Sequence, residues 1–126
     1  MIVKIVLELR DIDFYDGRLE WSLPVLPRVG EVFSVSLLAR AFDMKQVFDR
    51  LSPEDQEIWE GYKPSFGKED FTKEELEQFC FMKYLDESEW LVLEEVWWMH
   101  SDELGPYPLL TVRERKHLHE PFFSED

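Results

Sequence analysis

The sequence predicts an α+β fold in which about five antiparallel strands form a curled sheet or a partly closed β-barrel, with a helical insertion between the third and fourth strands. Three observations lead to this prediction. Apolar residues alternate with a period of two over 1–38, follow helical spacing over 39–88, and return to a period of two over 89–114. Residues 115–126 follow as a C-terminal arm. A length of 126 residues fits one domain, 1–126, with a single core.

The N-terminal part has the pattern of a β-meander. Apolar side chains occupy alternate positions over 3–9 and over 19–23, which indicates two strands that each bury one face. An Asp-Gly pair between them is a hairpin turn signal. Pro24 and Pro27 end the second strand, because proline has no N–H to donate to a strand ladder. A turn then leads into a third strand, expected over 32–37.

The middle part predicts three helices. The first has apolar residues at helical spacing after Asp43, a residue type that caps helix N-termini well. The second is expected over 52–62, with a proline in its first turn, where the missing N–H is not needed. A loop is expected over 61–67. The third helix begins at a capping box, which Thr72 and Glu75 form.

The charge of the chain excludes some classes of partner. The formal net charge is −14, from 28 acidic and 14 basic residues, and the stretch 41–90 carries 14 of the acids against six bases. Such a surface repels phosphate groups, so we expect no direct binding to nucleic acid or to an anionic membrane. The charge permits a basic protein as partner, although it also serves solubility by itself.

Cysteine usage and hydropathy favour a cytoplasmic protein. Cys80 is the one cysteine, so no internal disulfide forms, as expected in a reducing compartment. No apolar run approaches the ~18 residues that a membrane span needs. Because Cys80 lies on the predicted apolar face of the third helix, we interpret it as a small core residue and not as a nucleophile.

The closing hairpin carries the candidate catalytic residues Glu94, Glu95 and His100. If His100 pairs with Tyr107, then Glu95 points toward the apolar side of its strand. A carboxylate buried there has a raised pKa, which would prepare it as a general acid or base. A β-bulge at Glu94 and Glu95, or a slip of register, would instead let both acids reach water, and this is the interpretation we prefer.

The same hairpin carries a candidate protein-binding surface, with Glu94 opposite Arg113 at its polar rim. Exposed aromatic side chains beside polar ones are typical of interaction hot spots. If the helices cover this face of the sheet, the same residues belong to the core. The predicted binding residues are Trp97, Trp98, His100, Tyr107 and Arg113.

The C-terminal arm contains a His-x-His pair, His117 and His119, and the two aromatic residues Phe122 and Phe123 with which it would pack. On a strand both imidazoles would point the same way, where they could share a metal ion with His100. Two neighbouring histidines are a small ligand set, so we predict no metal site. No glycine-rich phosphate loop and no nucleophile motif is present in the sequence, so we predict no cofactor.

The sequence therefore favours a non-enzymatic protein–protein interaction domain, of inhibitor or immunity type, with a basic protein as partner. Two alternatives stay open. One is a small-molecule or hydrolytic site around Glu94, Glu95 and His100, and the other is a structural component of a larger assembly. The sequence also permits a homo-oligomer.

Overall fold

A computed structural model of the protein describes residues 1–9, 12–66, 71–87 and 90–115. Along these residues two β-hairpins enclose a series of helices. The elements in chain order are β1 (Ile2–Leu9), β2 (Ile12–Glu20), α1 (Val35–Ala41), α2 (Met44–Arg50), α3 (Pro53–Phe66), α4 (Lys73–Glu87), β3 (Trp90–Ser101) and β4 (Gly105–Arg115).

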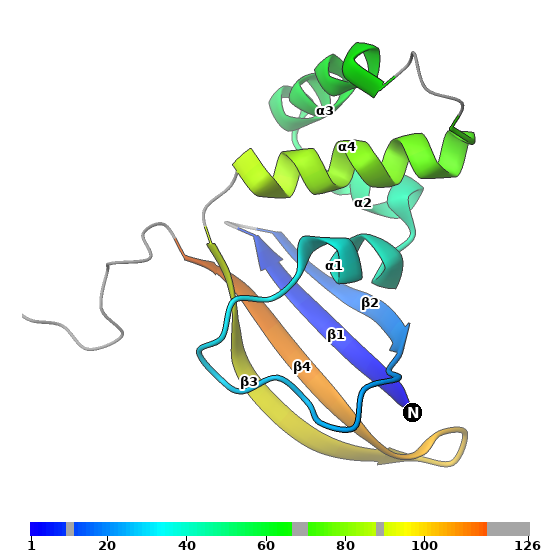
Figure 1. Ribbon diagram of the computed structural model, residues 1–126, viewed down its shortest axis with the longest axis vertical. Coiled ribbons are helices and arrows are strands. Elements are labelled where there is room, and N and C mark those ends of the chain that lie inside the picture. The colour runs from blue at the N-terminus through cyan, green and yellow to red at the C-terminus, as the bar shows by residue number, and fades with distance from the viewer. Residues whose placement is uncertain (10–11, 67–70, 88–89, 116–126) are drawn as a thin grey trace, which may run out of the picture.

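The described strands form one mixed sheet in the order β2-β1-β4-β3 (Figure 1). β1 pairs antiparallel with β2, and β3 pairs antiparallel with β4, but the central strands β1 and β4 are parallel. The α+β class is confirmed. The sheet differs from the prediction in having four strands, one parallel pair and no closure into a barrel. The parallel pair arises because the helical insertion carries the chain to the far edge of the sheet, from which β4 returns beside β1.

The third predicted strand, 32–37, is replaced by a single bridge and a helix. Val32 bridges to Val92 of β3, and α1 begins at Val35. The apolar residues that follow are spaced so that one helical face meets the core. The helical insertion therefore starts before residue 39, where it was expected. The buried side chains of α1 are Leu38, Ala39 and Ala41.

Two predicted helix starts are confirmed by their hydrogen bonds. The Asp43 side chain accepts from the backbone N–H of Lys45 at 3.0 Å, at the N-cap of α2. Before α4, Thr72 N–H donates to Glu75 Oε1 at 2.9 Å, and Glu75 N–H donates to Thr72 Oγ1 at 3.1 Å. The backbone N–H of Thr72, and after it the Thr72 side chain, stabilise the Glu75 carboxylate and hold the pKa of this carboxyl below its usual value.

The loop expected over 61–67 is helical as far as Phe66, because α3 continues through Pro64. This proline lies in the last turn of α3, where it removes the one N–H that would donate to the carbonyl of residue 60. Lys63 also ties this turn to α4, since its Nζ lies 2.8 Å from Glu77 Oε1. The contact between α3 and α4 thus accompanies a helix over residues whose types had predicted a loop.

The helices cover one face and one end of the sheet (Figure 1). Every second side chain of β1 is buried, as its alternation predicted, and these side chains join the core formed with the helices. We call the opposite side of the sheet the open face; apart from the buried Val92, its described side chains are half-buried or exposed. They include Ile2, Lys4 and Val6 of β1, Tyr107, Leu109 and Thr111 of β4, and Glu95, Trp97 and Met99 of β3.

Candidate functional site

A β-bulge in the β3–β4 hairpin sets which side chains lie together. Glu94 is the extra residue, and pairing resumes at Glu95. His100 pairs with Pro106, whereas the register considered from the sequence paired it with Tyr107. A shift of one residue moves side chains to the other face of a strand, so the bulge decides the composition of both faces.

The three candidate catalytic residues do not form a site. Glu95 is exposed on the open face, where its Oε2 accepts a hydrogen bond from Trp97 Nε1. Glu94 is half-buried at the bulge. His100 is exposed and lies on the helix side of β3, away from the face that carries Glu95. The preferred interpretation was a bulge that lets both acids reach water; the bulge is present and Glu95 is exposed, but Glu94 stays half-buried.

Three consecutive apolar side chains near the end of β3 are exposed, with fractions of 58% for Trp97, 61% for Trp98 and 42% for Met99. Successive side chains of a strand point to opposite faces, so Trp97 and Met99 share the open face and Trp98 lies on the helix side. Tyr107 pairs with Met99, and the Lys4 ammonium lies 5.4 Å from the Tyr107 ring centre. We call Trp97, Met99 and Tyr107 the hairpin surface.

Two exposed ion pairs lie on the same side of the sheet. Arg113 lies opposite Val92 in the β3–β4 ladder and not, as expected, opposite Glu94, and its Nε donates to Glu8 Oε1 of β1 at 2.6 Å. This hydrogen bond raises the pKa of Arg113. Arg18 of β2 reaches Glu103 in the hairpin turn at 3.2 Å. Exposed pairs contribute little stability, but they give the open face a polar rim.

The five predicted binding residues are divided between the two faces of the hairpin. Trp97, Tyr107 and Arg113 belong to the open face, whereas Trp98 and His100 lie on the helix side. In the register that pairs His100 with Tyr107, the side chains of Trp98, His100 and Tyr107 would share one face of the hairpin. The bulge separates them, and it places Met99 opposite Tyr107 on the open face.

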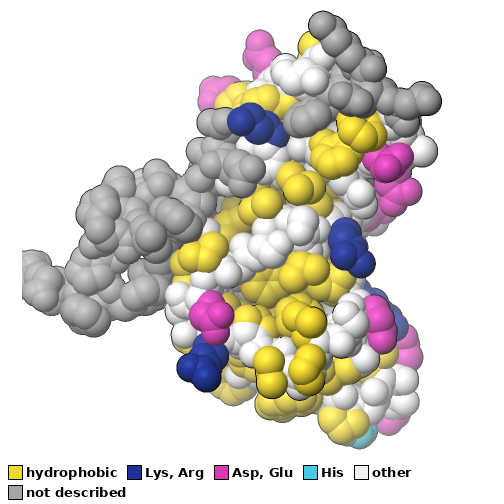
Figure 2. Space-filling model, viewed as in Figure 1, with side chains coloured by type: hydrophobic (Ala, Val, Ile, Leu, Met, Phe, Trp, Pro, Cys, Tyr) yellow, Lys and Arg dark blue, Asp and Glu magenta, His cyan; other side chains and the backbone are white. Residues whose placement is uncertain are grey.

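The structure also exposes apolar residues outside the hairpin, which were not among the predicted binding residues. They lie in the segment that crosses the helix side of the sheet between β2 and α1, where hydrophobic side chains gather in Figure 2. A signal was present, because two prolines prevent this segment from pairing as a regular strand that would bury its side chains. The exposed residues are Leu23, Val25, Val29 and Val32.

Exposed acidic side chains lie around the helical end of the molecule, and Figure 2 shows others over the sheet and the hairpin end. This agrees with the excess of acids over bases in residues 41–90. Such a cluster produces a negative potential that reaches beyond the surface and attracts positively charged molecules. Exposed carboxylates on α3 and α4 include Glu54, Glu57, Glu60, Glu74 and Glu75.

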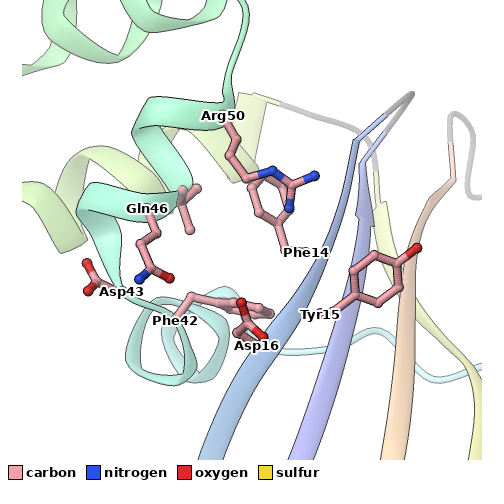
Figure 3. Close-up of a pocket in the computed structure, with 8 residues that line it drawn as sticks. Phe14, Tyr15, Asp16, Phe42, Asp43, Gln46 and Arg50 are labelled. Carbon is pink, nitrogen blue, oxygen red and sulfur yellow. The ribbon is translucent and has the colours of Figure 1, made fainter.

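Two hollows lie beside α2. The smaller, of about 30 Å³, has room for about one water molecule. Its wall includes Phe14, and the Arg50 guanidinium lies 4.9 Å from that ring and donates to the Asp13 carbonyl at 2.6 Å (Figure 3). The larger, of about 550 Å³, opens between the starts of α2 and α4. Its lining mixes Lys45 and Lys73 with three carboxylates, so it favours neither sign of ligand charge.

Cys80 is fully buried on α4, and burial raises the pKa of its thiol to about 11. We expect native Cys80 to react with a disulfide reagent at pH 8 on the order of a hundredfold more slowly than in denaturant, because little thiolate forms. Absorbance of the released chromophore measures this rate. A native rate close to the denatured one would contradict the interpretation of Cys80 as a core residue.

The predicted metal ligands His117 and His119, together with Phe122 and Phe123 of the C-terminal arm, lie outside the described residues. Within the described part of the chain, no group of three or more His, Cys, Asp or Glu side chains lies close enough to hold a metal ion. No helix there is both long enough and apolar enough to cross a membrane. Comparison of the chain with family models, curated proteins and solved structures finds no match.

Proposed function

We propose that this chain is a non-enzymatic protein-binding domain, of inhibitor or immunity type, which binds a basic partner protein. The observation that carries this proposal is the exposure of Trp97 and Met99, beside the half-buried Tyr107, in the hairpin surface on the open face. Tryptophan and tyrosine dominate the binding energy of many interfaces, and methionine adapts to irregular partner surfaces. Exposed apolar side chains gathered in one place commonly mark an interaction site.

The charge distribution supports a basic partner. The helical end carries exposed carboxylates, and the chain as a whole has a net charge of −14. Long-range attraction raises the rate at which an oppositely charged protein arrives, whereas the buried apolar contacts set how slowly it leaves. The acidic helices would therefore steer the partner, and the hairpin surface would hold it.

The two alternatives have less support. A hydrolytic site depended on a desolvated Glu95, and this side chain is exposed. A structural component of a larger assembly would bury the hairpin surface as a binding domain does. It differs in forming a multimer with many copies, which sedimentation of the complex would reveal.

Affinity capture from native lysate of the source cells tests the proposal. At low salt we expect the wild-type chain to retain a basic protein in stoichiometric amount. The double substitution Trp97→Ala with Met99→Ala should weaken its retention by about tenfold or more, because two central side chains are removed. Binding should also weaken as salt rises, since charges of opposite sign are screened.

The matched control is the double substitution Leu23→Ala with Val25→Ala, which also truncates two exposed apolar side chains, but on the helix side. It should leave retention unchanged. Recovery of no stoichiometric partner at low salt would count against the proposed function. Equal loss of binding in both double variants would move the site away from the hairpin surface.

A further inference from the structure

The outer edge of β3 is only partly paired. β3 is the last strand of the sheet on its side, and β4 pairs along its length. On the other side, the segment 30–33 covers the beginning of β3, with Gly30 N–H donating to the Leu93 carbonyl at 2.8 Å and Leu93 N–H donating to the Glu31 carbonyl at 3.0 Å. Among the residues that the structure describes, no strand pairs with this edge beyond Leu93.

The prolines of β4 show which backbone groups of β3 point outward. Trp98 pairs with Pro108 and His100 pairs with Pro106, and neither proline has an N–H to donate. These are therefore non-hydrogen-bonded positions of the ladder, at which the N–H and C=O of β3 point away from β4. By the same alternation, Val96 also directs its backbone groups outward. The edge thus presents a row of donors and acceptors.

This edge lacks most of the features that keep sheet edges from pairing. Such features are lysine, proline, inward-pointing charges and bulges. The stretch 95–101 has no lysine or proline, its one acid is Glu95, and the bulge lies before it. Large apolar side chains stand on both sides, with Trp97 and Met99 on one and Trp98 on the other. The edge is therefore suited to accept another strand.

We propose that a second copy of this chain pairs with the edge, so that two β3 strands run antiparallel about a two-fold axis at Trp98. Trp98 is the middle residue of the free stretch 95–101, so this register uses all of the stretch and leaves the segment 30–33 in place. Val96 then faces His100 of the second copy, and about six backbone hydrogen bonds form. A register centred on Val96 would run into the segment 30–33.

The side chains are compatible with this register. Glu95 faces Ser101 of the second copy, so the one acid of the stretch does not oppose its own copy. Trp97 faces Met99 of the second copy on the open face, where paired side chains lie close together. The two hairpin surfaces therefore meet across the axis and form one continuous apolar surface. This dimer does not depend on the proposed function, but it would double the area offered to a partner.

Sedimentation equilibrium of the full chain over a range of concentrations tests the dimer. We expect the weight-average mass to rise from monomer toward dimer. His100→Pro removes an outward N–H without disturbing the pairing with Pro106, so it should raise the dimer dissociation constant by about tenfold or more. The matched control His100→Thr keeps the N–H and should stay within about threefold of the wild type. Circular dichroism checks that both variants fold.

Disulfide crosslinking tests the register independently. A Trp97→Cys chain mixed with a Met99→Cys chain should form a linked dimer about tenfold faster than either chain alone, because only the mixture places two thiols opposite each other. Native Cys80 is buried and does not compete. Equal rates in the mixture and in the separate chains would overturn the register even if His100→Pro fails to fold.

A chain that stays monomeric at all concentrations would overturn the dimer, as would a dimer that His100→Pro leaves unchanged. The dependence on salt concentration distinguishes failure of the dimer from failure of the proposed function. Two chains that each carry −14 repel one another, so the dimer should become tighter as salt rises, whereas binding of a basic partner should become weaker. A dimer without a captured partner would support the edge and count against the proposed function.

Discussion

Replacing Trp59 with alanine is expected to lower the free energy of unfolding by about 4 kcal/mol. The Trp59 ring is fully buried between α3 and α4, with ring centres 5.4 Å from Phe48 and 5.6 Å from Phe81. Its Nε1 donates to Glu77 Oε2 at 2.8 Å. Truncation leaves a large cavity and removes the donor from a half-buried carboxylate. Chemical denaturation monitored by circular dichroism measures the change.

Two further variants separate the causes of this loss. Trp59→Phe keeps a ring in the cavity but removes the hydrogen bond to Glu77, and we expect it to cost about 1 to 2 kcal/mol. Tyr15→Ala truncates an exposed aromatic ring on β2 and should change stability by less than about 0.5 kcal/mol. If Trp59→Ala lowers the free energy of unfolding no more than Tyr15→Ala does, the described packing of α3 against α4 is contradicted.

Replacing Gly17 with alanine is expected to destabilise the fold by about 2 to 3 kcal/mol. A methyl group at this position of β2 would lie 2.6 Å from the edge of the Phe42 ring and 2.7 Å from the Ile5 carbonyl oxygen. The ring can shift a little, but the carbonyl belongs to the neighbouring strand and cannot. The contact would push β2 away from β1 or α1 away from the sheet. Thermal unfolding measures the effect.

Gly61→Ala is the matched control, because it makes the same change at a position where an added methyl group meets no atom within 4 Å. Gly61 lies within α3, so alanine should stabilise the protein by about 0.5 to 1 kcal/mol through the lower entropy of the unfolded chain. The two substitutions are thus expected to act in opposite directions. Equal effects would contradict the close approach of Phe42 to β2.

Local signals in the sequence were sufficient for several elements. The capping box of Thr72 and Glu75 and the N-cap at Asp43 involve residues within three positions of each other, so nothing distant was needed to predict them. The alternation of β1 was equally clear, because each buried side chain on that strand meets the same core. The α+β class followed from these changes of period along the chain.

The Asp-Gly pair, a local turn signal, lies inside β2 and not at a turn. The other incorrect expectations depended on contacts between distant residues. The segment at Val32 pairs with β3 through a single bridge, to Val92, which lies 60 residues further along the chain. The bulge at Glu94 depends on how β3 fits between β4 and that segment. α3 extends through Pro64, where Lys63 contacts Glu77 on another helix. None of these partners can be read from a local pattern.

The candidate site shows the same division. The sequence indicated that aromatic residues gather on the closing hairpin, and the exposure of Trp97 and Trp98 agrees with that. It could not assign them to faces, because one extra residue in a strand moves each later side chain to the opposite side. For this reason Met99 belongs to the hairpin surface, whereas His100, a predicted binding residue, lies on the opposite face of β3.

The sequence by itself determined this protein's net charge of −14 and the places where α2, α3 and α4 begin. These depend on residue types and on interactions within about one helical turn. Only the tertiary structure decided that β1 and β4 run parallel, that Glu95 reaches water and that one edge of β3 is partly unpaired. Strand order and register depend on how well the whole sheet packs against the helices, and that free energy belongs to no single segment.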